Sequence, residues 1–265
     1  MKGAVSLARL LLTLRYKGTA YHGWQVQPNG VTVQECLQNA VERVTGVRSG
    51  ITGCSRTDAG VHAEMFCCAL DTASPLRGGK LVRALNACLP EDIGVYDCRE
   101  VANSFHPRYR ALGKRYVYQI WNGAARNPFF ADTALFRQLP LPVEALDEAA
   151  RDFIGTHDFK AFCAAGSSVE DTVRTVSHAA VTRQGELVCF EVEADGFLYN
   201  MVRIMVGTLL DMAGGRIPYD AIPAILESGD RNRAGMTAPA QGLFLKAVYY
   251  PEEEVGLWPP ITTRG

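Results

Sequence analysis

Hydrophobic positions recur along the chain with two different periods. Apolar runs and strict alternation predict strands, whereas apolar positions spaced by three and four residues predict helices. Thr32 and Glu35 form a capping box at the start of the first helical segment, and Gly214 with Gly215 ends the last long one. The predicted strands are 10–14, 65–70, 93–101, 114–121, 173–181, 187–194 and 242–250. The predicted helices are 33–44, 76–89, 143–154, 198–213 and 219–226.

Strands and helices are mixed through the whole sequence. Residues 182–186 separate two strands as a hairpin turn would, which indicates antiparallel pairing. No low-complexity linker interrupts the chain. We therefore expect an α+β (mixed α/β) fold, with two α/β halves, 1–104 and 105–265, that share a largely antiparallel central sheet with flanking helices.

The chain has 265 residues, of which 48% are hydrophobic and 21% charged, as in an ordinary globular protein. Lys and Arg total 27 against 28 Asp and Glu, so a polyanion partner would need a local rather than a global positive charge. One stretch, 101–131, has no acidic residue. Its basic side chains are His106, Arg108, Arg110, Lys114, Arg115 and Arg126. It is either a solvated basic surface or a contact region for nucleic acid.

The eight cysteines form no CxxC pair and no cluster with histidine at zinc spacing, so no metal site is expected. Buried thiols of this kind are typical of a reducing compartment, which indicates a cytoplasmic protein. The apolar run 10–14 is bounded by Arg9 and Arg15 and is too short for a membrane span. No nucleotide-binding glycine loop or serine-hydrolase motif is present.

The most concentrated candidate for chemistry is the loop 53–63, Gly-Cys-Ser-Arg-Thr-Asp-Ala-Gly-Val-His-Ala. Glycines on both sides and Arg56 nearby suggest that Asp58 is held out for reaction. An Asx-turn, in which the Asp58 side chain bonds its own loop backbone, is the structural alternative. His62 stands at the mouth of an apolar strand, where a neutral, hydrogen-bonded histidine is the commoner outcome.

This loop resembles the GRTDAGVHA motif of the tRNA pseudouridine synthase A family, with Ser55 where the family commonly has glycine. Further motifs along nearly the whole chain resemble those of the same family and follow one another in the family's order. Lys17 departs from the family's pattern, since the family often has Asp at this position. These motifs are 21–27 (Tyr-His-Gly-Trp-Gln-Val-Gln), 105–108 (Phe-His-Pro-Arg), 114–118 (Lys-Arg-Tyr-Val-Tyr), 158–162 (Asp-Phe-Lys-Ala-Phe), 200–203 (Asn-Met-Val-Arg) and 240–243 (Ala-Gln-Gly-Leu).

The resemblance implies the pseudouridine synthase fold and an isomerase that converts uridine to pseudouridine in tRNA. It implies that Asp58 is the catalytic nucleophile, whether it attacks the base, attacks the ribose C1′ or promotes elimination to a glycal. Arg203 would pair with Asp58, Tyr116 would pack against the uracil, and Arg56 would occupy the space that the flipped base leaves. Tyr118 is expected to be support or core packing.

The resemblance further implies a homodimer that binds the anticodon stem-loop of tRNA and modifies uridines 38, 39 and 40, with no cofactor and no metal. Two other functions are considered beside it. One is a non-catalytic RNA-binding or tRNA-folding module on the same fold. The other is an Asp-dependent nucleoside or glycoside hydrolase, which is the weakest because the sequence offers no convincing second carboxylate as the acid partner.

Overall fold

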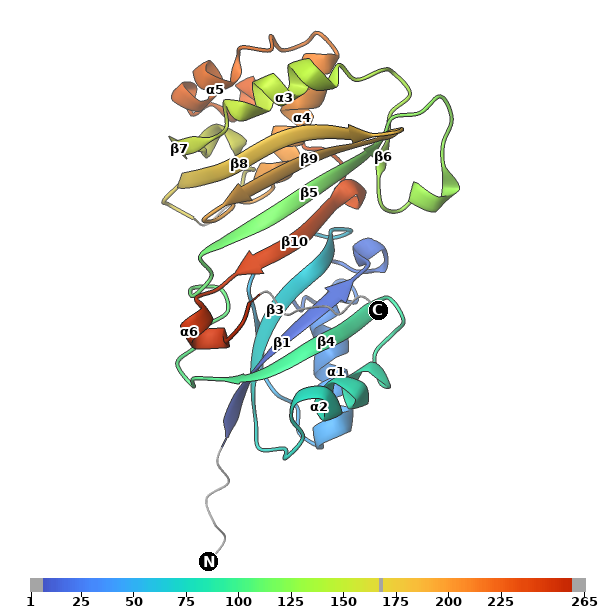
Figure 1. Cartoon of the computed structure of the whole chain (residues 1–265), viewed down its shortest axis with the longest axis vertical. Helices are drawn as coiled ribbons and strands as arrows, with labels where there is room; N and C mark the ends of the chain where they lie inside the picture. The colour runs from blue at the N-terminus through green and yellow to red at the C-terminus, as the bar shows by residue number, and fades with distance from the viewer. Residues whose placement is uncertain (1–6, 167–168, 259–265) are drawn as a thin grey trace, which may run out of the picture. The chain divides into compact units, whose positions relative to one another are not determined.

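A computed structural model describes residues 7–166 and 169–258 of the chain. These residues divide into two compact units, the first made of 7–112 with 245–258 and the second of Gly113–Phe244. Each unit combines strands and helices (Figure 1). The units differ from the halves 1–104 and 105–265 that the sequence suggests, because the last strand returns the C-terminal residues to the first unit.

The first unit is built around β1 (Ala8–Tyr16), which lies between β3 and β4 and is antiparallel to both. Leu10, Leu11 and Leu12 have no exposed surface. Consecutive buried residues on a strand require both of its faces to be covered, so β1 is the centre of this core. The strand order is β4-β1-β3-β10, and β2 also pairs with β3. The bounds are β2 (Ile51–Gly53), β3 (His62–Thr72), β4 (Ile93–Val101) and β10 (Leu243–Tyr249).

Helix α1 (Val33–Thr45) begins as the capping pattern predicts. The Thr32 hydroxyl oxygen accepts a hydrogen bond from the Glu35 backbone N–H at 3.3 Å, and Gly46 ends the helix at a φ of 77°. Helix α2 (Gly78–Asn86) packs beside α1 and against β4, and it is shorter than the expected 76–89. Short α6 (Glu252–Val255) lies in the acidic C-terminal segment, where the sequence pattern predicts no helix.

In the second unit β5 (Gly113–Trp121) pairs with β9 (Leu187–Ala194), and β9 pairs with β8 (Val173–Gln184), all antiparallel. Gly185 adopts a φ of 61° in the turn between β8 and β9, which confirms the hairpin. Strand β7 (Gly155–Asp158) extends the order to β5-β9-β8-β7.

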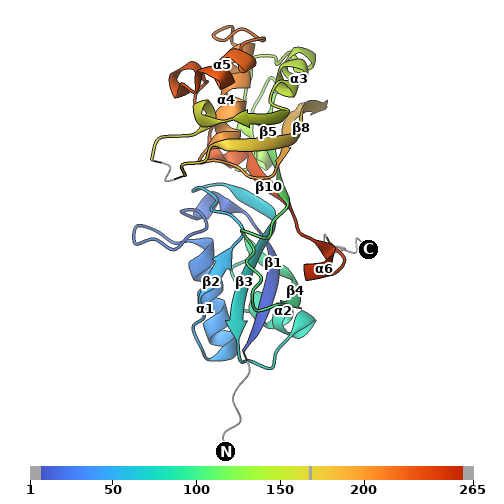
Figure 2. The same ribbon diagram turned by 90° about the vertical axis from the view of Figure 1, so that its left-hand side faces the viewer.

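The helices of the second unit are α3 (Val143–Arg151), α4 (Met201–Ala213) and α5 (Ile222–Ser228), which lie on one side of its strands (Figure 2). In α4 every residue from Met201 to Met212 is buried except Arg203. A helix that is apolar on all sides must be enclosed by other elements, so α4 is the core helix of this unit.

The expected mixture of helices with largely antiparallel strands is confirmed. Strands β2, β6 (Leu135–Phe136) and β7 have no counterpart in the sequence prediction, because two to four residues are too few to show a period. In the described parts of the chain, no helix has the length and apolar character needed to cross a membrane.

Candidate active site

The loop that carries Asp58 connects β2 to β3 in the first unit and is anchored at its beginning. Cys54 is fully buried, and its backbone N–H donates to the Cys67 carbonyl at 2.8 Å. Thr57 is also buried, whereas Asp58 is half-buried and Arg56 is exposed. The loop therefore leaves Asp58 half-buried, on a backbone that is hydrogen-bonded to β3 at its beginning.

A second segment, residues 18–24, lies directly against this loop. The Trp24 N–H donates to the Thr57 carbonyl at 3.1 Å, and the Gly60 N–H donates to the Tyr21 carbonyl at 3.2 Å. Gly23 adopts a φ of 84°, and a Cβ on it would lie 2.4 Å from the Thr57 carbonyl oxygen. Only glycine allows both this backbone conformation and this approach.

The hydrogen bond from Gly60 bears on the Asx-turn alternative. In such a turn the Asp58 side chain would accept the N–H of the residue two positions on, which is Gly60. That N–H instead donates to the Tyr21 carbonyl, while the backbone carbonyl of Asp58 accepts the Val61 N–H at 3.1 Å. These main-chain hydrogen bonds fix the backbone of the loop on both sides of Asp58.

Buried side chains support the loop from below. The Tyr16 hydroxyl and the Thr57 hydroxyl are 2.8 Å apart, and the Trp24 ring stacks on Phe66 with centroids 4.0 Å apart. His62 is 1% exposed, and its Nδ1 accepts the Gly18 N–H at 2.9 Å, so this histidine has the structural role that the sequence favours. Tyr16 and Gly23 carry no local pattern that marks them as supports of the loop, although Gly23 stands within the motif 21–27.

Tyr116 lies on β5 in the second unit and is 6% exposed. Its ring packs edge-on against Phe197 with centroids 4.9 Å apart. Tyr118, two residues on, is fully buried, and its hydroxyl donates to the Pro239 carbonyl at 2.8 Å. Burial raises the pKa of Tyr118, and the nearby charge of Arg203 acts in the opposite direction. Tyr118 thus has a structural environment, as expected.

Arg203 is the third residue of α4 and is half-buried. Its Nε donates to the Ala238 carbonyl at 2.7 Å, and its Nη1 donates to Asn200 Oδ1 at 2.8 Å. An arginine on a helix surface would extend its guanidinium into water. Here two hydrogen bonds fix the plane of the group within the second unit.

The basic stretch 101–131 is less positive in the fold than in the sequence. Arg110 forms an ion pair with Glu254, and Arg115 lies 3.0 Å from Glu193, while Lys114 is buried. Distant acidic residues are brought to the stretch by α6 and β9, which a local count of charges does not register. Arg108, Arg110 and Arg126 are its exposed arginines, and of these Arg110 is paired with Glu254.

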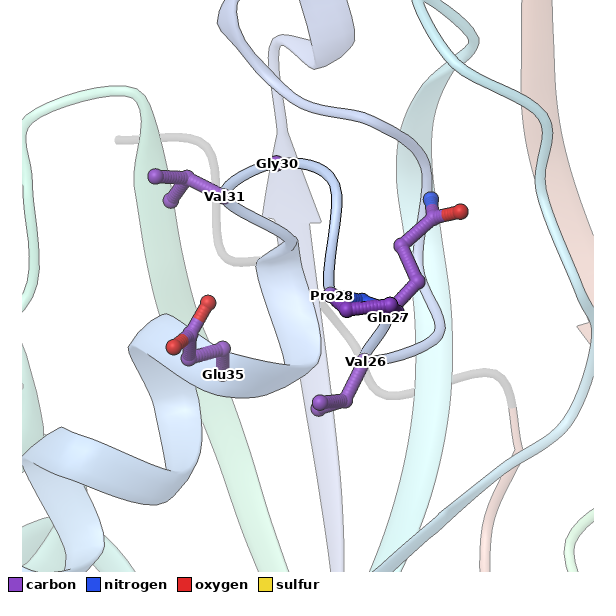
Figure 3. Close-up of a pocket in the computed structure, with 6 residues that line it drawn as sticks. All are labelled: Val26, Gln27, Pro28, Gly30, Val31 and Glu35. Atoms are coloured by element: carbon purple, nitrogen blue, oxygen red, sulfur yellow. The ribbon is translucent and has the colours of Figure 1, made fainter.

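An open hollow lies elsewhere in the first unit, between the loop 26–31 and the start of α1 (Figure 3). It is lined by Val26, Gln27, Pro28, Gly30, Val31 and Glu35. The four side chains that the resemblance assigns to chemistry, all of them in described parts of the chain, do not line it. Within those parts no three His, Cys, Asp or Glu side chains are grouped as a metal ion would require. All eight cysteines are free thiols.

The sequence of the chain matches a known protein family. Residues 13–110 and 149–251 match the family model described as tRNA pseudouridine synthase, which includes the Asp58 loop, Arg56 and Arg203. Tyr116 lies between the two matched segments. The chain belongs to the tRNA pseudouridine synthase family, whose members are isomerases.

Individual relatives are similar over most of their length. A protein of Acetivibrio thermocellus named tRNA pseudouridine synthase A is 45% identical over 90% of this chain and 98% of its own. The protein of the same name from Thermoanaerobacter sp. is 45% identical over 92% of this chain and 100% of its own. That from Exiguobacterium sibiricum is 42% identical over 95% of this chain and 100% of its own. A solved Cbf5-Nop10-Gar1 complex overlaps with a TM-score of 0.37 at 14% identity, covering 89% of this chain and 48% of that one, which is too distant to bear on fold or function.

Proposed function

We propose that this protein converts uridine to pseudouridine in the anticodon stem-loop of tRNA, at positions 38, 39 and 40. The membership of the chain in the tRNA pseudouridine synthase family is the observation that carries the proposal. In this reaction the bond from the uracil N1 to the ribose C1′ breaks and a bond from C5 to C1′ forms. The proton on C5 leaves and N1 gains one, so the composition is unchanged and no cofactor is needed.

Asp58 is the nucleophile of this proposal. Asp58 is half-buried on a loop whose backbone is bonded to residues 21 and 24, and the buried Thr57 hydroxyl ties the same loop to β1. A fixed backbone of this kind supports catalysis because it removes the freedom that a reacting group would otherwise lose in the transition state. All three routes use this carboxylate, as a nucleophile in attack on the base or on C1′ and as a base in elimination to a glycal.

Arg203 and Tyr116 are the partners that we assign to Asp58 and to the uracil. A guanidinium near the Asp58 carboxylate would stabilise its ionised, nucleophilic form. The two hydrogen bonds that orient Arg203 support such a role, since a solvated arginine would not need them. Tyr116 is held by its contact with Phe197, which suits a ring against which a base packs.

Arg56 is assigned to the space that the target nucleotide leaves. A base in a paired stem must be flipped out before it can react, which costs a few kcal/mol of stacking and pairing. Arg56 is exposed and lies two residues from Asp58. Its planar cation can stack on bases and contact phosphate, so it can offset part of this cost.

We further propose that the protein acts in the cytoplasm as a homodimer.

The test is to incubate the protein with unmodified tRNA transcripts and to map pseudouridine at each position. We expect product at 38, 39 and 40, and none with Asp58→Asn, while that variant still binds tRNA. Asp220→Asn, at an exposed carboxylate outside the proposed site, is the matched control and should retain full activity. Absence of product with the wild type, or full activity of Asp58→Asn, would overturn the proposal. Binding without product in the wild type would indicate the non-catalytic RNA-binding module.

A further inference from the structure

Asn200 has an unusual backbone conformation next to Arg203. Among the described residues it is the only one other than glycine with a positive φ, at 59°. Asparagine tolerates this left-handed region better than most residues, but glycine adopts it without steric cost. A glycine at position 200 would therefore satisfy the backbone alone, and the presence of a side chain calls for a separate reason.

Asn200 is also the N-cap of α4, where asparagine normally accepts a hydrogen bond from a backbone N–H of the first helical turn. No such bond is formed by its side chain. Asn200 Oδ1 instead accepts from Nη1 of Arg203, the residue at the third helical position, at 2.8 Å. The side chain that would cap the helix is used to hold a side-chain cation.

The other side of the Arg203 guanidinium is held by the segment 235–238. The Ala238 carbonyl accepts from Arg203 Nε, and the Ala238 N–H donates to the Arg203 carbonyl at 3.0 Å. This segment lies tightly on α4, because a Cβ on Gly207 would fall 1.6 Å from the Met236 carbonyl oxygen. The Gly235 N–H donates to the Thr208 hydroxyl at 2.9 Å and fixes the segment further.

We propose that Asn200 is a positioning residue for the isomerisation, because its side-chain oxygen, opposite the Ala238 carbonyl, sets the direction in which the Arg203 guanidinium points. A planar group bonded at two of its nitrogens cannot rotate, so its charge stays in one place without reorganisation during the reaction. This inference rests on the role proposed above for Arg203. The left-handed backbone places Asn200 Oδ1 beside Arg203 rather than beside the helix N–H groups.

The test compares Asn200→Gly with the wild type in single-turnover assays on unmodified tRNA. Glycine keeps the left-handed backbone, so the melting temperature should stay within about 3 °C of the wild type. The rate of the chemical step should fall about tenfold, the effect of losing one hydrogen bond to a charged group, while the Kd for tRNA changes less than twofold. Asn127→Gly, which removes the side-chain cap of a short helix in the same unit, is the control and should leave the rate unchanged.

Measuring Asn200→Gly in an Arg203→Lys variant as well distinguishes a failure of this inference from a failure of the proposed function. Arg203→Lys retains the charge but loses the planar group, and it should lower the rate by itself. If Asn200 acts through the guanidinium, adding Asn200→Gly to Arg203→Lys should change the rate less than twofold, because coupled residues are not additive. Two outcomes would overturn the role of Asn200 and leave that of Arg203 intact. One is that Asn200→Gly lowers the rate equally in the wild-type and Arg203→Lys backgrounds. The other is that Asn200→Gly has the wild-type rate while Arg203→Lys is impaired. A wild-type rate for Arg203→Lys overturns the role proposed for the Arg203 guanidinium, and with it the basis of this inference.

Discussion

The hydroxyl groups of Tyr16 and Thr57 lie 2.8 Å apart in the core of the first unit, so the last residue of β1 is bonded to the residue before Asp58. Both side chains are buried, at 4% and 8% exposure, so neither hydroxyl can exchange this bond for water at little cost. The position of the Asp58 loop is thus coupled to β1, the strand at the centre of the unit's core.

Tyr16→Phe removes one of these hydroxyl groups and leaves the Thr57 oxygen without this bond. We expect the free energy of unfolding to fall by about 1–2 kcal/mol and the rate of pseudouridine formation to fall, with little change in tRNA affinity. Urea unfolding and single-turnover assays measure the two effects. The control is Tyr96→Phe, since the Tyr96 hydroxyl makes a longer bond of 3.3 Å to the Glu64 carbonyl. Equal losses in both variants would show that the Tyr16 bond has no special role.

Gly23→Ala tests the close approach of the two loops. Alanine at a φ of 84° is strained by roughly 1–2 kcal/mol, and its Cβ would also overlap the Thr57 carbonyl. Gly46→Ala is the matched control, because Gly46 has a φ of 77° with nothing within 4 Å of an added Cβ. We expect Gly46→Ala to lose stability only, and Gly23→Ala to lose a further 1–3 kcal/mol and at least tenfold in rate, since small displacements of reacting groups are costly. Similar behaviour of the two variants in calorimetry and activity assays would contradict this.

Asp147 in α3 gives an acid-dependent contribution to stability. Burial alone would raise the pKa of Asp147, but the hydrogen bonds from the Val181 N–H at 2.8 Å and from Arg151 at 2.7 Å outweigh it and lower that pKa. The folded-state pKa is therefore below the unfolded value of about 3.9, and the stabilisation is present above that value and lost as the pH falls through the folded pKa.

We therefore expect Asp147→Asn to be about 1–2 kcal/mol less stable than the wild type at pH 7, and the difference to shrink as the pH falls below about 4. Urea denaturation at a series of pH values measures it. Asp220→Asn, at an exposed position, should follow the wild-type curve. A difference that stays constant over this range would mean that the carboxylate charge is not what Val181 and Arg151 stabilise.

The exposed cations of the stretch 101–131 should differ in their contribution to tRNA binding. Arg108→Ala should weaken binding and reduce the slope of log K against log salt by about one, as expected for one lost phosphate contact. Arg110→Ala should have a smaller effect, because Glu254 already neutralises much of the Arg110 charge. Filter binding at several salt concentrations distinguishes them, and identical slopes for wild type and Arg108→Ala would exclude a phosphate contact at this residue.

Much of the fold is present in the local pattern of the sequence. The period of apolar residues predicts α1, β4, β5, the β8–β9 hairpin and α4 to within a few residues, because each of these elements buries one face or all of its faces in a continuous core. The helix ends are also predicted locally, at Thr32 and Glu35 and at the glycines after α4. The backbone groups at a helix end are satisfied by nearby residues, so the signal is local in the sequence. Strands of two to four residues, such as β2 and β7, bury too little to leave a pattern.

The sequence by itself determined the family of the protein and the residue types available for chemistry, because a motif such as 53–63 is a local property of the chain. Only the tertiary structure decided how those residues are held. The close approach of Gly23 to Thr57 and the hydrogen bond between Asn200 and Arg203 both depend on the backbone conformation. Glu254 pairs with Arg110, from which it is 144 residues distant in the sequence. Contacts of this kind depend on positions in space, which neither composition nor period encodes.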